Sequence, residues 1–446
     1  MPSSALALQL DRHLPAPLGV QLSRQIRQLV TSGALRRGDR LPSSRALAAD
    51  LGVSRSIPEQ AYEQLVAEGW LEGRHGAGTF VASDGTTRDV GRRSRPVASQ
   101  GPPLVRLDAG TPWIDPRHQA GWRRAWREVA NASPPRGYDD PRGIPELRSA
   151  LADHLGRTRG LAVDPDEVVV TAGTTDGLRH VVTVLRPGAI AMEDPGYRAA
   201  VETVGATGRD VVDLPALAPI TSLEGCAAAY VTPAHQHPLG RVMPAADRLT
   251  LLDAARGSGA LVVEDDYDSE FRYDVAPVPA LAALDREHVA YLGTAAKSVA
   301  PSMRLGWLVA PPDVLASINH RRDITHEGAP WPTQRAFLSL LRDGYVDKVV
   351  RSARRVYADR APRVASALMP YAEVAGPLAG MYSTWLLPAE AALRAQAHAR
   401  AAGFEVNLLA DYCRSAGLTG LVVGFGGASD EQLDRALSAL VEGLQD

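Results

Sequence analysis

The chain has 446 residues, a length that predicts two or three folded units rather than one. Hydrophobic residues make up 45% of it and charged residues 22%, a balance that excludes collagen, coiled-coil rods and a mainly disordered chain. The formal net charge is only −3, so any affinity for nucleic acid must come from a local basic patch.

The sequence also limits where the protein works. It contains no run of about eighteen apolar residues that could cross a membrane. Its first residues lack the basic start and the apolar run of a secretory signal. The two cysteines, Cys226 and Cys413, lie far apart and have no metal-ligand spacing. We therefore expect a cytoplasmic protein without disulfides and without a metal site.

Residues 1–83 are expected to form a winged helix-turn-helix, a DNA-binding domain. Apolar residues at helical spacing predict a first helix that ends before Gly33 and a second, short helix that follows Pro42. Ser54 is expected to cap a third helix. Two short strands around a Gly-rich turn then predict a hairpin, or wing.

In such a unit the N-terminal residues of the third helix enter the major groove of DNA. The residues that we expect at the DNA surface lie at the starts of the second and third helices and on the wing, and they are Arg45, Ser54, Arg55, Ser56, Arg74 and His75. Many three-helix units have nothing to do with DNA, but the added hairpin and these arginines favour a DNA reader. Residues 1–83 carry nine arginines against seven acidic residues. So slight a basicity predicts few phosphate contacts and a dimer on two half-sites.

A linker and a larger unit are expected to follow. Residues 84–104 are rich in Gly, Pro, Ser, Thr and Arg and lack apolar periodicity, which is typical of a tether. Over residues 105–446 short apolar strands alternate with helical segments, which predicts an α/β domain with a mainly parallel sheet and helices on both faces. After residue 333 a long helical stretch and a smaller α+β segment predict a second lobe.

Three of the predicted strands end in polar groups that fit one ligand. Thr174 and Thr175 follow the first at a helix start, a pattern typical of a phosphate cradle or of an ordinary capped loop. Residues 264–266, all acidic, end the second and need a cationic partner unless they lie at the surface. Lys297 follows the third, and Arg304 lies seven residues beyond it. Parallel strand ends share one edge of a sheet, so these groups would converge there. Together they are what pyridoxal 5′-phosphate (PLP) requires.

The use of lysine points to the same residue. Of the 48 basic residues, 46 are arginine, and the two lysines are Lys297 and Lys348. A lysine can form an imine with an aldehyde because it can lose its proton, which arginine does not do. Lys348 lies in a basic helical stretch where a solvated position explains it, whereas Lys297 follows an apolar strand.

At the level of whole blocks the chain resembles known families. Residues 14–83 resemble the winged helix of the GntR class, in the blocks LPSSRALAADLGVSRS and YEQLVAEGWLEGRHGAGTFV. Residues 105–446 resemble a fold-type-I aminotransferase, in the blocks YDDPRGIPELRSAL, VTAGTTDGL, EDPGY, VTPAHQHPLG, VEDDYDSEFRYD and GTAAKSVAPSMRLGW. The two in this order resemble the MocR-type transcription regulators, over nearly the whole chain.

The resemblance implies a role for nine residues. Lys297 is similar to the Schiff-base lysine, Tyr197 to the residue that stacks on the cofactor ring, and Tyr267 to the one that bonds the ring hydroxyl. Asp265 resembles the partner of the pyridine nitrogen, with Asp266 as the alternative. The residues implied to hold the phosphate are Thr174, Thr175, Thr294 and Arg304, together with Tyr138 from the other subunit of a homodimer with shared sites.

The chain departs from the aminotransferase pattern at two positions. The family's carboxylate-binding arginine lies in a C-terminal run like LRLGF, and here Val422 replaces it. His237 stands where the Asn of the NPTG block is common. A bidentate arginine orients an amino-acid substrate, so its loss argues against efficient transamination. A third departure is in the DNA reader, where Ile57 and Pro58 follow Ser56, and Ile57 removes a hydroxyl that could meet a phosphate.

We therefore expect a regulator rather than an enzyme, one that senses PLP itself and controls vitamin B6 biosynthesis genes, as the PdxR-like members of the family imply. One alternative is a regulator that senses a small amine or sulfonate through bound PLP. Others are a working aminotransferase and a DNA-binding protein whose large domain only dimerises. The effector beyond PLP, the target genes, the half-site arrangement and the choice between activation and repression stay open at this point.

Overall fold

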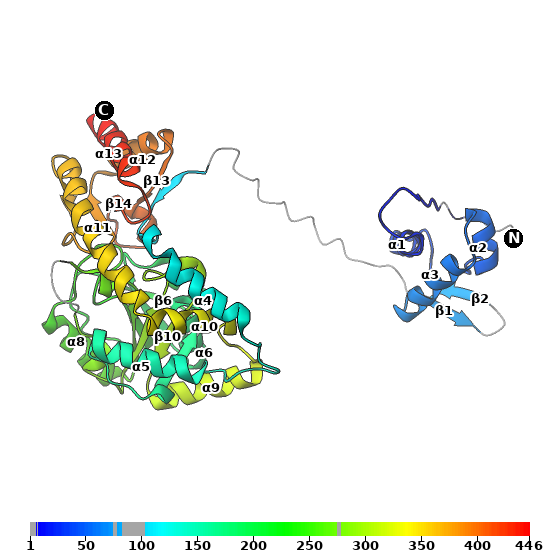
Figure 1. Cartoon of the computed structure of the whole chain (residues 1–446), viewed down its shortest axis with the longest axis horizontal. Coiled ribbons are helices and arrows are strands. Elements are labelled where there is room, and N and C mark those ends of the chain that lie inside the picture. Colours follow the sequence, from blue (N-terminus) through cyan, green and yellow to red (C-terminus); the bar gives the residue numbers. More distant parts are fainter. Residues whose placement is uncertain (1–5, 7, 75–77, 83–102, 274–277) are drawn as a thin grey trace. The chain divides into compact units, whose positions relative to one another are not determined.

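A computed structural model describes residues 6, 8–74, 78–82, 103–273 and 278–446. The chain divides into two compact units, Met1–Gln100 (unit 1) and Gly101–Asp446 (unit 2), shown in Figure 1. The expected linker lies almost wholly outside the described residues, so the domain boundaries stay predictions. In the described part of the chain, no helix is both long and apolar enough to span a membrane. The expected cytoplasmic location also stays a prediction.

Unit 1 is a winged helix-turn-helix. Its elements are α1 (Leu18–Thr31), α2 (Ser44–Leu51), α3 (Ser56–Ala67), β1 (Leu71–Arg74) and β2 (Gly78–Val81). The two strands pair antiparallel as the expected hairpin. Leu22, Ile26 and Leu65 are fully buried between the helices and form the core with Val81 of the wing. Gly52 closes α2 with φ +63°, a left-handed conformation that glycine adopts without strain, and this makes the tight turn into α3.

The start of α3 differs from the expectation. Ser54 does not cap the helix, because Arg55 already has helical backbone angles and occupies the N-cap position without a side-chain cap bond. The Ser54 hydroxyl instead lies 2.9 Å from the Ser56 hydroxyl, and the backbone N–H of Ile57 bonds the Ser54 carbonyl oxygen at 3.1 Å. Pro58 lies in the first turn, where a missing N–H leaves no helical bond unmade.

Unit 2 is built on a seven-stranded sheet with the order β4-β10-β9-β8-β7-β5-β6. Its strands are β4 (Val168–Thr171), β5 (Ala189–Asp194), β6 (Val211–Pro215), β7 (Cys226–Val231), β8 (Leu261–Asp266), β9 (Val289–Thr294) and β10 (Gly306–Val309). β10 is antiparallel to both of its neighbours, and the other pairs are parallel. The expected α/β fold is confirmed. Edge strand β6, half exposed and without strict alternation, escaped the sequence reading.

Helices cover both faces of this sheet (Figure 1). Alternate residues of β4 show why, since Val168 and Val170 belong to one buried cluster and Val169 to another. The helices of unit 2 are α4 (Gln119–Asn131), α5 (Pro145–Arg159), α6 (Thr174–Val184), α7 (Arg198–Gly205), α8 (Ala245–Ser258), α9 (Pro312–Thr325), α10 (Trp331–Arg342), α11 (Tyr345–Leu368), α12 (Ala389–Ala401) and α13 (Asp430–Gln445). Strands that are buried on both sides read as continuous apolar runs, as observed in the sequence.

The smaller lobe contains a five-stranded sheet with the order β11-β12-β14-β13-β3. Its strands are β11 (Glu373–Val374), β12 (Tyr382–Leu386), β14 (Gly420–Gly424), β13 (Phe404–Leu408) and β3 (Val105–Leu107). Four come from the C-terminal part of the chain, as expected. The fifth, β3, comes from the beginning of unit 2 and pairs in parallel with β13 at the edge of the sheet.

Candidate cofactor and DNA-binding sites

The carboxyl ends of β4, β8 and β9 meet at a cavity of about 570 Å³. This volume is in the usual range for a small-molecule site. Eight of the nine residues expected to bind a cofactor line it, and they are Thr174, Thr175, Tyr197, Asp265, Tyr267, Thr294, Lys297 and Arg304. The ninth, Tyr138, lies elsewhere. The topology therefore brings together side chains that are up to 130 residues apart in sequence (Thr174 to Arg304).

Lys297 lies just beyond the end of β9 and is half-buried. Its Nζ donates a hydrogen bond of 2.5 Å to the carbonyl oxygen of Gly110. Burial lowers the pKa of the amine, and the nearby carboxylates of Asp268, Asp108 and Asp265 oppose this shift. A lowered pKa raises the fraction of neutral amine, which is the form that attacks a carbonyl carbon.

Asp265 is the residue before the last in β8 and is 3% exposed. One carboxyl oxygen, Oδ2, accepts a hydrogen bond from the Tyr230 hydroxyl. The other, Oδ1, is buried and has no hydrogen-bond partner among the described residues. Burial raises the pKa of this carboxyl to about 7. A buried oxygen without a partner is costly, and a ligand that presents an N–H group to Oδ1 in the cavity would remove that cost.

The two acidic neighbours of Asp265 lie away from the cavity. Asp266, the alternative partner of the pyridine nitrogen, is 2.5 Å from the guanidinium of Arg159 and accepts the Tyr291 hydroxyl at 2.6 Å. Glu264 is fully buried and accepts the backbone N–H groups of residues 281 and 282. The strand's alternation separates the three acids, so that only Asp265 faces the cavity, and none of them lies at the surface.

The part of the cavity at the start of α6 is suited to a phosphate. Thr174 and Thr175 form the first turn of α6, where free N–H groups favour an anion. Gly173 precedes them with φ +111°, and a Cβ there would lie 3.9 Å from the guanidinium of Arg304. That guanidinium has no ion-pair partner in the part of the chain that the structure describes. The Thr294 hydroxyl already bonds the Leu305 carbonyl oxygen at 3.2 Å.

Aromatic side chains also line the cavity. Tyr197 lies edge-on to His237, with ring centroids 5.5 Å apart. Burial lowers the pKa of His237 to about 3, so its ring is neutral. The Tyr267 hydroxyl donates to the His235 carbonyl oxygen and lies 2.8 Å from the Tyr382 hydroxyl. An uncharged wall of this kind can pack against a flat ring.

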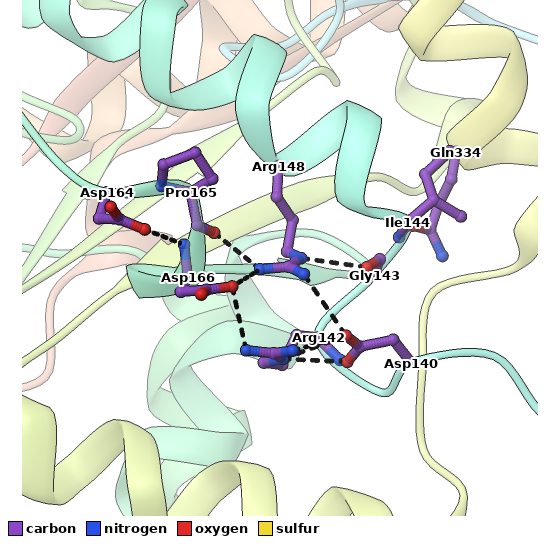
Figure 2. Close-up of polar contacts among 9 residues, drawn as sticks. All are labelled: Asp140, Arg142, Gly143, Ile144, Arg148, Asp164, Pro165, Asp166 and Gln334. Carbon is purple, nitrogen blue, oxygen red and sulfur yellow. Dashed lines mark hydrogen bonds and ion pairs between the residues drawn. The ribbon is translucent and has the colours of Figure 1, made fainter.

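Tyr138 is 81% exposed and lies outside the cavity. Its ring stacks on that of His326 at a centroid distance of 4.0 Å. The loop that carries it is held by two arginines, as Figure 2 shows. Arg142 bonds Asp140 at 2.8 Å, and Arg148 donates to the Gly143 carbonyl oxygen at 3.2 Å. A well-held loop with an exposed tyrosine is compatible with its implied role in another subunit.

Val422, at the position of the missing arginine, is fully buried in β14 between Thr384 and Asn407 on the neighbouring strands. This strand therefore brings no cation to the cavity. The arginines among its lining residues are Arg304, near Gly173, and Arg106 and Arg198. Arg106 is committed to Asp108 at 3.0 Å.

In unit 1 the described residues among those expected to bind DNA lie at the surface. Arg45 is exposed at the start of α2. Arg55 makes an ion pair of 2.7 Å with Glu59, one turn further along α3. Arg74 pairs with Glu72 at 2.6 Å, and its guanidinium lies 4.6 Å from the centre of the Phe80 ring. His75 lies outside the described residues.

Sequence reasoning missed several residues of the cavity. Tyr230, the hydrogen-bond partner of Asp265, lies within an apolar strand and gave no polar signal. Gly110 takes part through its backbone. Asn407 and Tyr412 come from the small lobe, whose Asn407 amide donates to the Tyr412 hydroxyl at 2.7 Å. Asn407 lies within β13 and Tyr412 in the short turn after it, and neither belongs to a sequence pattern that marks a site.

A winged helix followed by an aminotransferase fold defines a class of protein, the DNA-binding regulator with an aminotransferase-like domain. Residues 18–81 match the model of bacterial regulatory proteins of the gntR family, and residues 103–440 match aminotransferase class I and II. The chain belongs to the MocR-type helix-turn-helix transcription regulators.

Two curated relatives illustrate this family. The chain is 34% identical to the pyridoxine biosynthesis transcriptional regulator PdxR of Corynebacterium glutamicum, over 98% of both chains. It is 36% identical to the probable rhizopine catabolism regulatory protein MocR of Rhizobium meliloti, over 79% of this chain and 77% of that one. Both are named as regulators and not as enzymes.

Solved structures show the fold of unit 2. An archaeal alanine:glyoxylate aminotransferase is 25% identical with a TM-score of 0.69, over 77% of this chain and 91% of that chain. The α-aminoadipate aminotransferase LysN of Thermus thermophilus, complexed with N-(5′-phosphopyridoxyl)-L-leucine, is 23% identical with a TM-score of 0.66, over 77% and 92% of the two chains.

Proposed function

We propose that this regulator binds PLP in the cavity, covalently through Lys297, and changes its binding to DNA in response, so as to control genes of vitamin B6 synthesis. The observation that carries the proposal is the pairing, in one cavity, of a half-buried amine with the partnerless carboxyl oxygen of Asp265. The name of the 34% identical relative, a pyridoxine biosynthesis regulator, supports the choice of signal.

Each residue has one task in this proposal. PLP supplies an aldehyde that condenses reversibly with an amine. Lys297 provides that amine, and Asp265 accepts a hydrogen bond from the pyridine nitrogen at its free oxygen. Thr174, Thr175 and Arg304 hold the phosphate at the start of α6. Together these contacts fix the ring against Tyr197.

The replacement of the arginine clamp by buried Val422 supports a sensor rather than an enzyme. A charge-assisted hydrogen bond to a substrate carboxylate contributes about 1.5–3 kcal/mol, and β14 offers no group to make one. The cofactor site itself does not depend on β14. PLP can change the affinity for DNA only if PLP itself binds the DNA-bound and the DNA-free protein with different affinity. The size of the change is set by that difference.

We also propose a homodimer in which Tyr138 of each subunit reaches the phosphate site of the other. Exposure of this aromatic side chain on a firmly held loop supports the assignment. Two winged helices in one dimer would read two half-sites on DNA, in direct or inverted orientation.

Reduction with borohydride tests the central proposal. PLP is added to the purified full-length protein, the sample is reduced, and peptides are examined by mass spectrometry. We expect a permanent phosphopyridoxyl adduct on Lys297 and none in Lys297→Ala. Lys348→Ala, which removes the other lysine of the chain, is the matched control and should retain the adduct. Reduced wild type without an adduct at Lys297 would contradict the proposal.

A second candidate is a regulator that senses a small amine through bound PLP. It is favoured by the part of the cavity that the cofactor residues leave unassigned, which Arg198, Glu202 and Asn407 line. Titration of PLP-loaded protein with candidate amines, followed by visible absorption, separates the two. A change of absorption at low amine concentration that also alters DNA binding would favour this candidate over direct sensing of PLP.

A further inference from the structure

The carbonyl oxygen of Gly110 connects the cofactor lysine to the beginning of unit 2. Lys297 Nζ donates to this oxygen at 2.5 Å across 187 residues of sequence. Gly110 lies three residues beyond β3, which is the first strand after the expected linker. The hydrogen bond therefore joins the loop after β9 of the large sheet to the loop that follows β3, the edge strand of the small sheet.

The segment around β3 has a short edge strand and three buried residues, 107–109. The strand pairs with one neighbour only, β13, over three residue pairs. Asp108 then accepts the backbone N–H of Gly110 at 2.8 Å and the Thr111 hydroxyl at 2.9 Å. Its own carbonyl oxygen packs on Gly424, where a Cβ would lie 1.9 Å away. A short edge strand opens more easily than the strands of the core, so one further bond matters to it.

We propose that Lys297 is a latch that holds the β3 segment, residues 105–111, in the cofactor-free protein and releases it when the lysine condenses with PLP. The inference rests on the proposed function and names its regulation. It assigns to Lys297 a second task besides holding the cofactor.

The chemistry of the lysine supports this. The neutral amine attacks the aldehyde carbon, its two hydrogens leave with the aldehyde oxygen as one water, and a C=N bond replaces the C=O bond. The nitrogen then carries a hydrogen only if it is protonated, and its position is fixed by the bond to the cofactor carbon. Lys297 therefore keeps at most one N–H donor, which lies fixed in the plane of the C=N bond and no longer rotates towards Gly110. The Gly110 residue is exposed, so its carbonyl oxygen can turn to water.

Release of the β3 segment can affect the winged helix because the two are joined directly along the chain. The winged helix is attached to unit 2 through the residues that immediately precede β3. How firmly residues 105–111 are seated then differs between the cofactor-free and cofactor-bound protein. A difference of this kind between two states is what coupling of two sites requires.

Hydrogen exchange measured by mass spectrometry on the full-length protein tests the latch. We expect amides in a peptide covering residues 104–111 to exchange about tenfold faster after PLP is added, equivalent to about 1.4 kcal/mol of opening free energy. Pyridoxine 5′-phosphate, which has an alcohol in place of the aldehyde, is the matched ligand and should leave this exchange unchanged. A peptide from β8 should not exchange faster with either ligand.

Two substitutions separate the donor from the condensing amine. Lys297→Met lacks both, and residues 104–111 should exchange fast with or without PLP. Lys297→Arg keeps N–H donors but cannot condense, and exchange should stay slow in both conditions. Equal exchange in cofactor-free wild type and Lys297→Met would overturn the latch, as would an adduct at Lys297 without faster exchange at 104–111. A missing adduct overturns the proposed function instead, and the comparison without cofactor still tests the latch.

Discussion

The residues expected to bind DNA and those expected to bind the cofactor are held in opposite ways. In unit 1, Arg55 and Arg74 are exposed, and each is paired with a glutamate of its own element. In unit 2, Asp265 and Lys297 are withdrawn from water, and Asp265 is only partly paired. Exposed pairs contribute about 0–1 kcal/mol, so a phosphate can replace them at little cost. A buried polar group without a hydrogen-bond partner lowers the stability of the fold until a ligand supplies that partner.

Asp266 and Asp265 also differ from each other, because the first is ion-paired and the second is only partly hydrogen-bonded. The largest change in stability is expected at Asp266. Asp266→Asn removes the charge that balances buried Arg159. Breaking a buried ion pair costs about 3–5 kcal/mol. We expect a loss of this size in the free energy of unfolding, measured by urea denaturation of the cofactor-free protein. Asp265→Asn is the control, and an equal loss there would mean that the two carboxyls are not held differently.

The stability of the protein should also depend on pH through Asp265. The pKa of Asp265 is raised to about 7 by burial, so between about pH 4 and 7 the folded carboxyl keeps a proton that the unfolded one has lost. Stability from this group is therefore present at low pH and lost as the pH rises. We expect its contribution to fall by about 1.4 kcal/mol per pH unit at most. Denaturation of wild type and Asp265→Asn at pH 5 and 7 measures it, and a smaller or absent fall is expected in the variant.

Cofactor affinity should respond to Asp265 and not to exposed ion pairs. Asp265→Asn removes the charged acceptor of a hydrogen bond worth about 1.5–3 kcal/mol. We expect PLP to bind about 10- to 100-fold more weakly, measured by titration of visible absorption. Arg55→Ala, in the other unit, should leave the titration unchanged.

The smallest effect is expected in unit 1. Arg55→Ala should weaken specific DNA binding by about 1–3 kcal/mol and change the free energy of unfolding by less than about 0.5 kcal/mol. Arg27→Ala breaks a comparable pair with Glu68 away from the expected DNA-reading turn, and should affect DNA binding less. A gel-shift titration on a duplex bound by the wild type compares the two. If both variants lost the same DNA affinity, Arg55 would have no special role in contacting DNA.

Much of the site could be predicted from sequence because its chemistry is unusual. Lys297 was visible because the chain keeps only two lysines. The choice between Asp265 and Asp266 was open, since it depends on which face of β8 is turned to the cavity. Tyr230 looked like any strand tyrosine, and Gly110 acts through its backbone. The predicted cap at Ser54 is wrong because the helix starts one residue later than expected, with Arg55 at the N-cap position. Sequence alone does not fix a helix start to a single residue.

The position of β3 has a consequence for how the protein is made. Its partner strand, β13, lies roughly 300 residues further along the chain, and ribosomes add about 5–20 residues per second. The small sheet therefore stays incomplete for roughly 15–60 seconds after β3 has been synthesised, whereas every element of the winged helix precedes it. During synthesis the domain with the DNA-reading helix can reach its final form long before the one that carries Lys297.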